Sequence, residues 1–138
     1  MRIAKSPIVM ILGILLASGS QSALAETHMV DAKATAFEPN VLFIEPGDSV
    51  KFTNMAGHDS VSMNDLIPEG ADGWKLAMGE EGSVTLDEEG VYIYKCTPHV
   101  AMGMVAAIVV GEPTNMDEVE ENASGMAKRA VNAVKQQI

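Results

Sequence analysis

Residues 91–110 read VYIYKCTPHVAMGMVAAIVV, two strand-like segments separated by a short loop. The first segment, Val91–Lys95, is rich in β-branched and aromatic residues, which favour strands. The last segment, Met104–Val110, is almost wholly apolar, as in a strand that is covered on both faces. The loop between them brings a thiol, an imidazole and thioethers together. This stretch therefore predicts two strands whose connecting loop carries candidate metal ligands.

The chain N-terminal to this stretch shows the same strand pattern. Ser49–Thr53 and Ser83–Leu86 alternate polar and apolar residues. Turn signals such as Pro46-Gly47-Asp48 separate the segments, and Asn64–Gly82 is predicted to be a long loop. Further extended segments are Val41–Ile44 and His58–Met63. Several short strands with frequent turns predict an all-β sandwich or barrel.

The pattern changes from strand to helix after residue 113. Asn115 with Glu118 three residues later is a helix-start signature, and it predicts a short acidic helix over Met116–Ala123. A second helix is predicted where apolar residues recur every four positions, at Met126, Ala130, Val134 and Ile138. We expect the helices to pack outside the sandwich, so that 114–138 is an extension of one domain spanning 26–113.

The first 25 residues contain the three parts of an export signal. Arg2 and Lys5 give a positive start, Ile8–Ala17 is a continuous apolar run, and the segment ends in the small-x-small sequence Ala23-Leu24-Ala25. The apolar run is much shorter than the roughly 20 residues that span a bilayer. We therefore expect residues 1–25 to be a signal peptide that is cleaved after Ala25, with no membrane insertion afterwards.

The mature chain is expected to be strongly acidic. Arg2 and Lys5 account for two of the nine basic residues, so seven remain against 19 acidic ones, a formal charge of −12. Such a surface repels nucleic acid and anionic lipid. The composition therefore argues against nucleic acid and membrane surfaces as partners.

Cys96 is the only cysteine of the chain. Because exported proteins usually pair their cysteines, an unpaired one indicates an intermolecular bridge, a reactive thiol or a metal ligand. His99 follows three residues later, Met102 and Met104 lie beyond it, and His58 lies at an upstream strand edge. Two imidazoles, one thiolate and a weak axial thioether form the ligand set of blue-copper electron-transfer sites. The spacing alone leaves Met102 and Met104 as alternative axial ligands.

Other interpretations of these residues fit less well. Catalysis by Cys96 and His99 lacks a third residue to orient the base, and a free thiolate is easily oxidised outside the cytoplasm, so we do not expect an enzyme. A structural zinc site prefers more Cys and His ligands. His28 fits a surface or hydrogen-bonded role. Core filling is expected for five methionines, namely Met55, Met63, Met78, Met116 and Met126.

From residue 37 to 111, and in its C-terminal helices, the sequence resembles the pseudoazurins, small periplasmic proteins of the cupredoxin family. The matching segments are Phe37-Glu38-Pro39, Pro46-Gly47-Asp48, Gly57-His58, Ile67-Pro68-Glu69-Gly70, Gly90-Val91-Tyr92, Lys95-Cys96-Thr97-Pro98-His99 and Met102-Gly103-Met104. The resemblance implies a Greek-key cupredoxin β-sandwich of about eight strands with one copper at one end. It assigns the axial role to Met104, so the implied ligands are His58, Cys96, His99 and Met104.

By the same resemblance, we expect a type 1 blue-copper protein that shuttles single electrons in the periplasm as a monomer. His99 would lie at the surface, within an apolar docking face formed by Pro98, Val100, Ala101 and Met102. The implied partners are periplasmic nitrogen-oxide reductases, such as nitrite reductase, and c-type cytochromes. The alternative function is a periplasmic copper carrier or store that uses the same ligands.

Two features depart from the family pattern. Pseudoazurins usually have Asn after the first ligand histidine, whereas this chain has Asp59. An ionised carboxylate only accepts hydrogen bonds, so we expect Asp59 to accept one from the backbone N–H or hydroxyl of Thr97 and to brace the two ligand segments. The family is also typically lysine-rich around the copper face. For this acidic chain, either the partner is basic or docking relies on the apolar face at high ionic strength.

Overall fold

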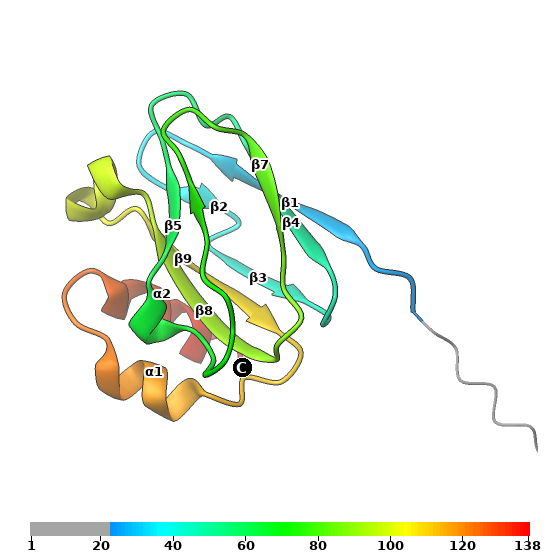
Figure 1. Cartoon of the computed structure of the whole chain (residues 1–138). Helices are drawn as coiled ribbons and strands as arrows, with labels where there is room; N and C mark the ends of the chain where they lie inside the picture. The colour runs from blue at the N-terminus through cyan, green and yellow to red at the C-terminus, as the bar shows by residue number, and fades with distance from the viewer. Residues whose placement is uncertain (1–22) are drawn as a thin grey trace, which may run out of the picture.

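The computed structural model describes residues 23–138, so most of the expected signal peptide lies outside the described residues. Two β-sheets face each other, and two helices lie against the outside of one of them (Figure 1). The strands are β1 (Thr27–Ala32), β2 (Phe37–Glu38), β3 (Val41–Ile44), β4 (Ser49–Thr53), β5 (Ser60–Ser62), β6 (Lys75–Leu76), β7 (Gly82–Thr85), β8 (Gly90–Lys95) and β9 (Val105–Val110). The helices are α1 (Met116–Asn122) and α2 (Ala127–Lys135), with short 3-10 helices η1 (Asn64–Leu66) and η2 (Thr97–Met102).

The two sheets have the strand orders β2-β1-β4-β7 and β3-β9-β8-β5-β6. β1 is parallel to β4 and β3 is parallel to β9, while the other neighbours are antiparallel. The predicted all-β sandwich with two C-terminal helices is confirmed. Residues 23–138 contain nine strands, in line with the expected number of about eight. The two-residue strand β6 lies in the segment expected to be one long loop, 64–82.

The main hydrophobic core lies between the sheets, and a second apolar cluster lies between the outer face of one sheet and the helices. On β8, Tyr92 and Tyr94 belong to the first cluster, while Val91 and Ile93 belong to the second. β9 alternates in the same way, and all six of its residues are buried. Both strands are therefore apolar on both faces, which explains the continuous apolar pattern of the sequence. The residues of α2 in the second cluster are Ala127, Ala130, Val131 and Val134.

The start of α1 differs from the prediction. Asn115 occupies the residue before the helix, but its side chain makes no capping hydrogen bond. Instead, its Oδ1 accepts a hydrogen bond from the N–H of Val91 at 2.7 Å, and its Nδ2 donates to the Val91 carbonyl at 3.0 Å. The buried amide therefore ties the helix start to β8, a contact between residues 24 positions apart.

Two of the five methionines predicted to fill the core are exposed. Met55 is fully buried and Met63 and Met116 are half-buried, but Met78 is 55% exposed and Met126 is 39% exposed. Met78 lies in the turn after β6, and Met126 lies just before the buried face of α2 begins. The prediction is wrong for these two residues because both lie at the ends of elements, where the chain faces solvent.

Candidate metal centre

The loop after β8 is folded tightly by its own backbone. The N–H of Cys96 donates to the carbonyl of Met104 at 3.0 Å, and the N–H of Met104 donates to the carbonyl of His99 at 3.2 Å. Gly103, between η2 and β9, has a φ of 89°, which glycine adopts at little cost. These contacts bring the start and the end of the loop together and hold Cys96 and His99 on one side of it.

His58 reaches the same place from the loop before β5. Its N–H donates to the carbonyl of Met55 at 2.9 Å, and its own carbonyl accepts from the N–H of Gly79 at 2.9 Å. Gly57, with a φ of 78°, turns the chain just before it. Because β5 pairs with β8 in antiparallel register, with Val61 opposite Lys95, the segment just before β5, which contains His58, lies alongside Cys96, the residue after β8.

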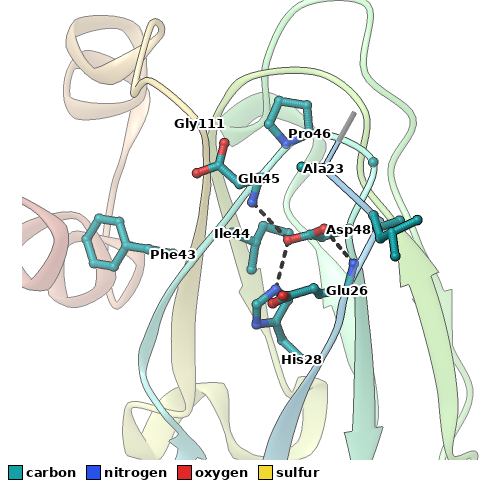
Figure 2. A pocket seen from close by; sticks show the side chains of 12 residues that line it. Ala23, Glu26, His28, Phe43, Ile44, Glu45, Pro46, Asp48 and Gly111 are labelled. Carbon is teal, nitrogen blue, oxygen red and sulfur yellow. Dashed lines mark hydrogen bonds and ion pairs between the residues drawn. The ribbon is translucent and has the colours of Figure 1, made fainter. Parts of the chain in front are cut away.

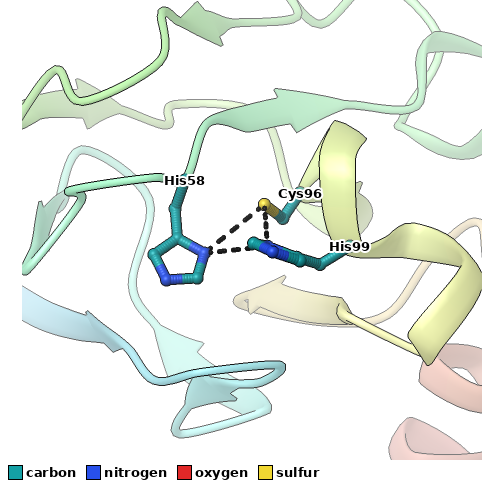
Figure 3. A group of neighbouring side chains, drawn as sticks. All are labelled: His58, Cys96 and His99. Carbon is teal, nitrogen blue, oxygen red and sulfur yellow. Dashed lines mark hydrogen bonds between the residues drawn. The ribbon is translucent and has the colours of Figure 1, made fainter.

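The three side chains converge from these two segments (Figure 3). The Sγ of Cys96 lies 3.6 Å from the Nδ1 of His58 and 3.4 Å from the Nδ1 of His99. The two Nδ1 atoms are 3.2 Å apart. Each residue therefore directs one donor atom into a common space.

Burial shifts the pKa of two members of the group, Cys96 and His58. Cys96 is fully buried, His58 is 8% exposed and His99 is half-buried. Burial raises the pKa of the Cys96 thiol. Burial, followed by the charge of His99, lowers the pKa of His58. A neutral imidazole keeps one ring nitrogen free to bind a metal, whereas the thiol must lose its proton before it can do so.

The donor atoms fit a single metal ion. Bonds of about 2.0–2.3 Å from a metal to N and S ligands in one plane separate the donors by roughly 3.5 Å, close to the observed separations. Hydrogen bonds alone do not explain the triangle, because each neutral imidazole carries only one N–H. Two imidazoles with one thiolate are the in-plane ligands of blue-copper sites, and the residues present therefore fit copper.

Comparison with known proteins agrees with this geometry. Residues 25–111 match the family of copper binding proteins described as the plastocyanin/azurin family. The pseudoazurin of Paracoccus pantotrophus is 34% identical over 122 residues, which cover 85% of this chain and 83% of that protein. The solved structure of a pseudoazurin from Sinorhizobium meliloti is 39% identical with a TM-score of 0.74, covering 80% of this chain and 97% of the other. This chain belongs to the pseudoazurins.

The pseudoazurin of Methylorubrum extorquens shows a higher identity over a shorter stretch. It is 46% identical over 77 residues, which cover 55% of this chain and only about half, 52%, of that protein. Membership of the pseudoazurins makes the chain a type 1 copper electron-transfer protein, an electron carrier and not an enzyme. The family also implies redox partners.

The two methionines of the pseudoazurin loop lie in different surroundings. Met104 is fully buried and belongs to the same core cluster as Cys96. Met102 is 56% exposed. A thioether that binds a buried metal has to be inside the protein, so this difference favours Met104 over Met102 as the axial ligand.

Asp59 makes the hydrogen bond that its sequence position predicts. Its Oδ1 accepts from the backbone N–H of Thr97 at 2.6 Å, and the residue is only 7% exposed. Since Asp59 follows His58 and Thr97 follows Cys96, this single bond ties the two ligand-bearing segments together. The prediction of a brace is confirmed.

One exposed residue near the site, Met78, could not be placed there from the sequence. Met78 lies in the turn whose Gly79 N–H binds the His58 carbonyl, so its exposed side chain lies at the same end of the sandwich as the site. The residue type of Met78 predicted a place in the core, and only the fold of the long 64–82 segment brings it to the copper end. We define the copper-end apolar face as Met78, Pro98, Val100, Ala101 and Met102, of which all but the half-buried Val100 are exposed.

Proposed function

We propose that electrons enter and leave this pseudoazurin at one copper held by His58, Cys96, His99 and Met104. The observation that carries the proposal is the convergence of Cys96 Sγ with two imidazole Nδ1 atoms within 3.6 Å. When bound, copper supplies the one-electron couple, since thiolate and thioether favour Cu(I) and imidazole suits both oxidation states.

The contribution of the protein is to hold these side chains in one arrangement. The backbone hydrogen bonds from Cys96 to Met104 and from Met104 to His99 fix the loop, and the bond between Thr97 and Asp59 fixes the loop to the His58 segment. Cys96 and Met104 are also packed in the main core. Such a site changes little between oxidation states, which favours fast electron transfer.

We further propose that redox partners dock on the copper-end apolar face. Electron-transfer encounters are generally small and weak, so a modest apolar surface beside half-buried His99 suffices. The proposed partners are periplasmic nitrogen-oxide reductases, such as nitrite reductase, and c-type cytochromes. The working protein is proposed to be a periplasmic monomer, with residues 1–25 removed and the helical extension 114–138 packed on the copper domain 26–113.

Copper titration followed by visible absorption and redox titration tests the function. We expect an intense blue absorption that saturates at one copper per chain and disappears reversibly on reduction. Cys96→Ser should bind copper without the blue colour, because the colour arises from the copper–thiolate bond. A wild-type protein that binds copper without blue colour and releases it readily would instead be a copper carrier or store.

A matched pair of variants tests the axial ligand. Met104→Leu should change both the visible spectrum and the reduction potential, because it removes the buried thioether. Met102→Leu should leave the spectrum unchanged, because Met102 is exposed. The opposite pattern would transfer the axial role to Met102.

A further inference from the structure

The end of the sandwich opposite the metal centre contains a buried carboxylate that contacts Glu26, the residue before β1, and His28 on β1. Asp48 is 5% exposed. Its Oδ1 accepts a hydrogen bond from the backbone N–H of Glu26 at 2.8 Å. Its Oδ2 lies 2.8 Å from the Nε2 of His28 and accepts from the N–H of Glu45 at 3.1 Å (Figure 2).

These contacts keep Asp48 ionised without supplying a permanent positive charge. The hydrogen bond from Glu26, then those from His28 and Glu45, lower the pKa of Asp48. Asp48 lies in a hollow at this end, and among residues 23–138 the hollow is lined by three acidic residues, Glu26, Glu45 and Asp48, and by no Lys or Arg. A buried carboxylate is costly unless it is fully paired. Of the described side chains that line the hollow, His28 alone can carry a positive charge.

The Glu26 nitrogen is also the atom that signal cleavage would release. The three residues before it, Ala23, Leu24 and Ala25, are all exposed, Leu24 to 90%. Hydrolysis of the Ala25–Glu26 peptide bond by an export peptidase consumes one water. The water oxygen goes to the new carboxylate of Ala25, and the Glu26 nitrogen becomes an α-ammonium group at neutral pH.

We propose that Asp48 is the binding site for the mature N-terminus, so that removal of the signal peptide replaces a neutral N–H contact with a buried ion pair. This inference rests on the proposed export and cleavage. Hydrogen bonds between charged groups are shorter and about twice as strong as neutral ones. The carbonyl of Glu26 already accepts a hydrogen bond from the N–H of Ser49 at 2.8 Å. The ion pair therefore stabilises the start of the β1–β4 pairing. This stabilisation is present only after the signal peptide has been removed.

Thermal unfolding of two copper-loaded proteins tests the proposal. One begins at Glu26, and the other begins at Leu24, which keeps the Glu26 N–H but moves the ammonium group about 7 Å along the chain. At pH 7 we expect the melting temperature of the protein that begins at Glu26 to be higher than that of the longer protein by about a few °C. Pairing favours the ammonium form, so the difference should be present at neutral pH and lost above about pH 10, where the α-amino group is uncharged.

A double-mutant cycle isolates the contact. Asp48→Asn should abolish the difference between the two proteins. Glu45→Gln, which removes a neighbouring carboxylate that does not contact the Glu26 nitrogen, should preserve it. Equal melting temperatures of the two chains at pH 7 would overturn the proposal, and so would a difference that survives Asp48→Asn or persists at high pH.

The premise has its own readout, separate from electron transfer. The mass of the exported protein should correspond to a chain that begins at Glu26, and a different start would overturn the proposal while leaving the copper site untouched. The blue absorption should be the same in both chain lengths and in Asp48→Asn. The side chains of His28, Glu26 and Glu45 line the same hollow, but they are common to the two chain lengths, so their effects cancel in the comparison.

Discussion

At the scale of single residues, Asp59 is the feature that most distinguishes this metal centre. It places a buried carboxylate directly after one proposed ligand and in contact with the backbone next to another. A second negative group beside the thiolate stabilises the more positive oxidation state of a bound metal. The hydrogen bond to Thr97 needs only an oxygen acceptor, so an asparagine amide can keep the brace while removing the charge.

We therefore predict that Asp59→Asn raises the reduction potential. The expected shift is on the order of tens of millivolts, because the charge is close to the site and poorly screened by solvent. Redox titration of the copper-loaded protein measures it. Asp65→Asn, at an exposed position in η1, serves as the control and should change the potential much less. An unchanged or lowered potential in Asp59→Asn would show that the carboxylate does not tune the site.

At the scale of secondary structure, the helices pack on the sandwich mainly through the apolar side chains of the second core cluster, and polar contacts are few. The Asn115 amide is one of these polar contacts, since it satisfies both the N–H and the carbonyl of Val91 at the edge of the second core cluster. Leaving two buried backbone groups without partners costs about 1–3 kcal/mol each.

We predict that Asn115→Ala lowers the free energy of unfolding by roughly 2 kcal/mol or more. Glu118→Ala removes the other residue of the helix-start signature, which is exposed, and should change stability by no more than about 0.5 kcal/mol. Urea unfolding monitored by circular dichroism compares the two variants. Equal losses would contradict a special stabilising role for the two hydrogen bonds between Asn115 and Val91.

At the scale of the whole molecule, charge is distributed unevenly between the two ends of the sandwich. The hollow at the end where β8 begins is lined by several acidic side chains and no Lys or Arg, namely Glu69, Asp87, Glu88, Glu89 and Glu118. At the other end of β8, Lys95 precedes Cys96, and Arg129 lines a hollow together with Met102 and Gly103. The copper end therefore has mixed charge, because Asp59, Glu80 and Glu81 also lie on the segments around the site.

This distribution bears on how a partner finds the copper. The six residues of β8 separate the ends by about 20 Å, more than twice the Debye length of roughly 8 Å at physiological ionic strength. A basic partner would be drawn to the acidic end, away from the copper. The arrangement thus favours docking through the copper-end apolar face over steering by the net negative charge.

We predict that the rate constant of electron transfer to the native partner changes little as salt is added. A basic partner that docks through charge would instead give a rate constant that falls steeply with salt. Stopped-flow kinetics over a range of ionic strength distinguishes the two cases. A steep fall would restore the basic-partner hypothesis.

The apolar face itself can be tested by introducing charge. Met102→Lys and Val100→Glu should both slow electron transfer at every salt concentration, because each buries a charge in the proposed contact. Met29→Lys is a matched control, since Met29 is 61% exposed on β1 of the other sheet, and it should leave the rate unchanged. Unchanged rates in the first two variants would place the docking surface elsewhere.

The sequence by itself determined the fold class and the metal-binding character of the chain. Strand and helix periodicities are local properties, so most of the sandwich strands and both C-terminal helices could be predicted from them, whereas β1 and the two-residue strands β2 and β6 were not. The loop after Lys95 holds a cysteine, a histidine and methionines within a few positions, and this spacing predicted a metal site. Asp59 could be assigned an acceptor role because an ionised carboxylate has no hydrogen to donate.

The tertiary structure decided which residues meet across long separations in sequence. It showed that Met104 is buried and Met102 exposed, that Met78 lies at the copper end, and that Asn115 pairs with β8 instead of capping α1. It also placed the Glu26 nitrogen on Asp48. These contacts depend on how the two sheets are stacked and on which strands pair, and no local pattern of residue types records either.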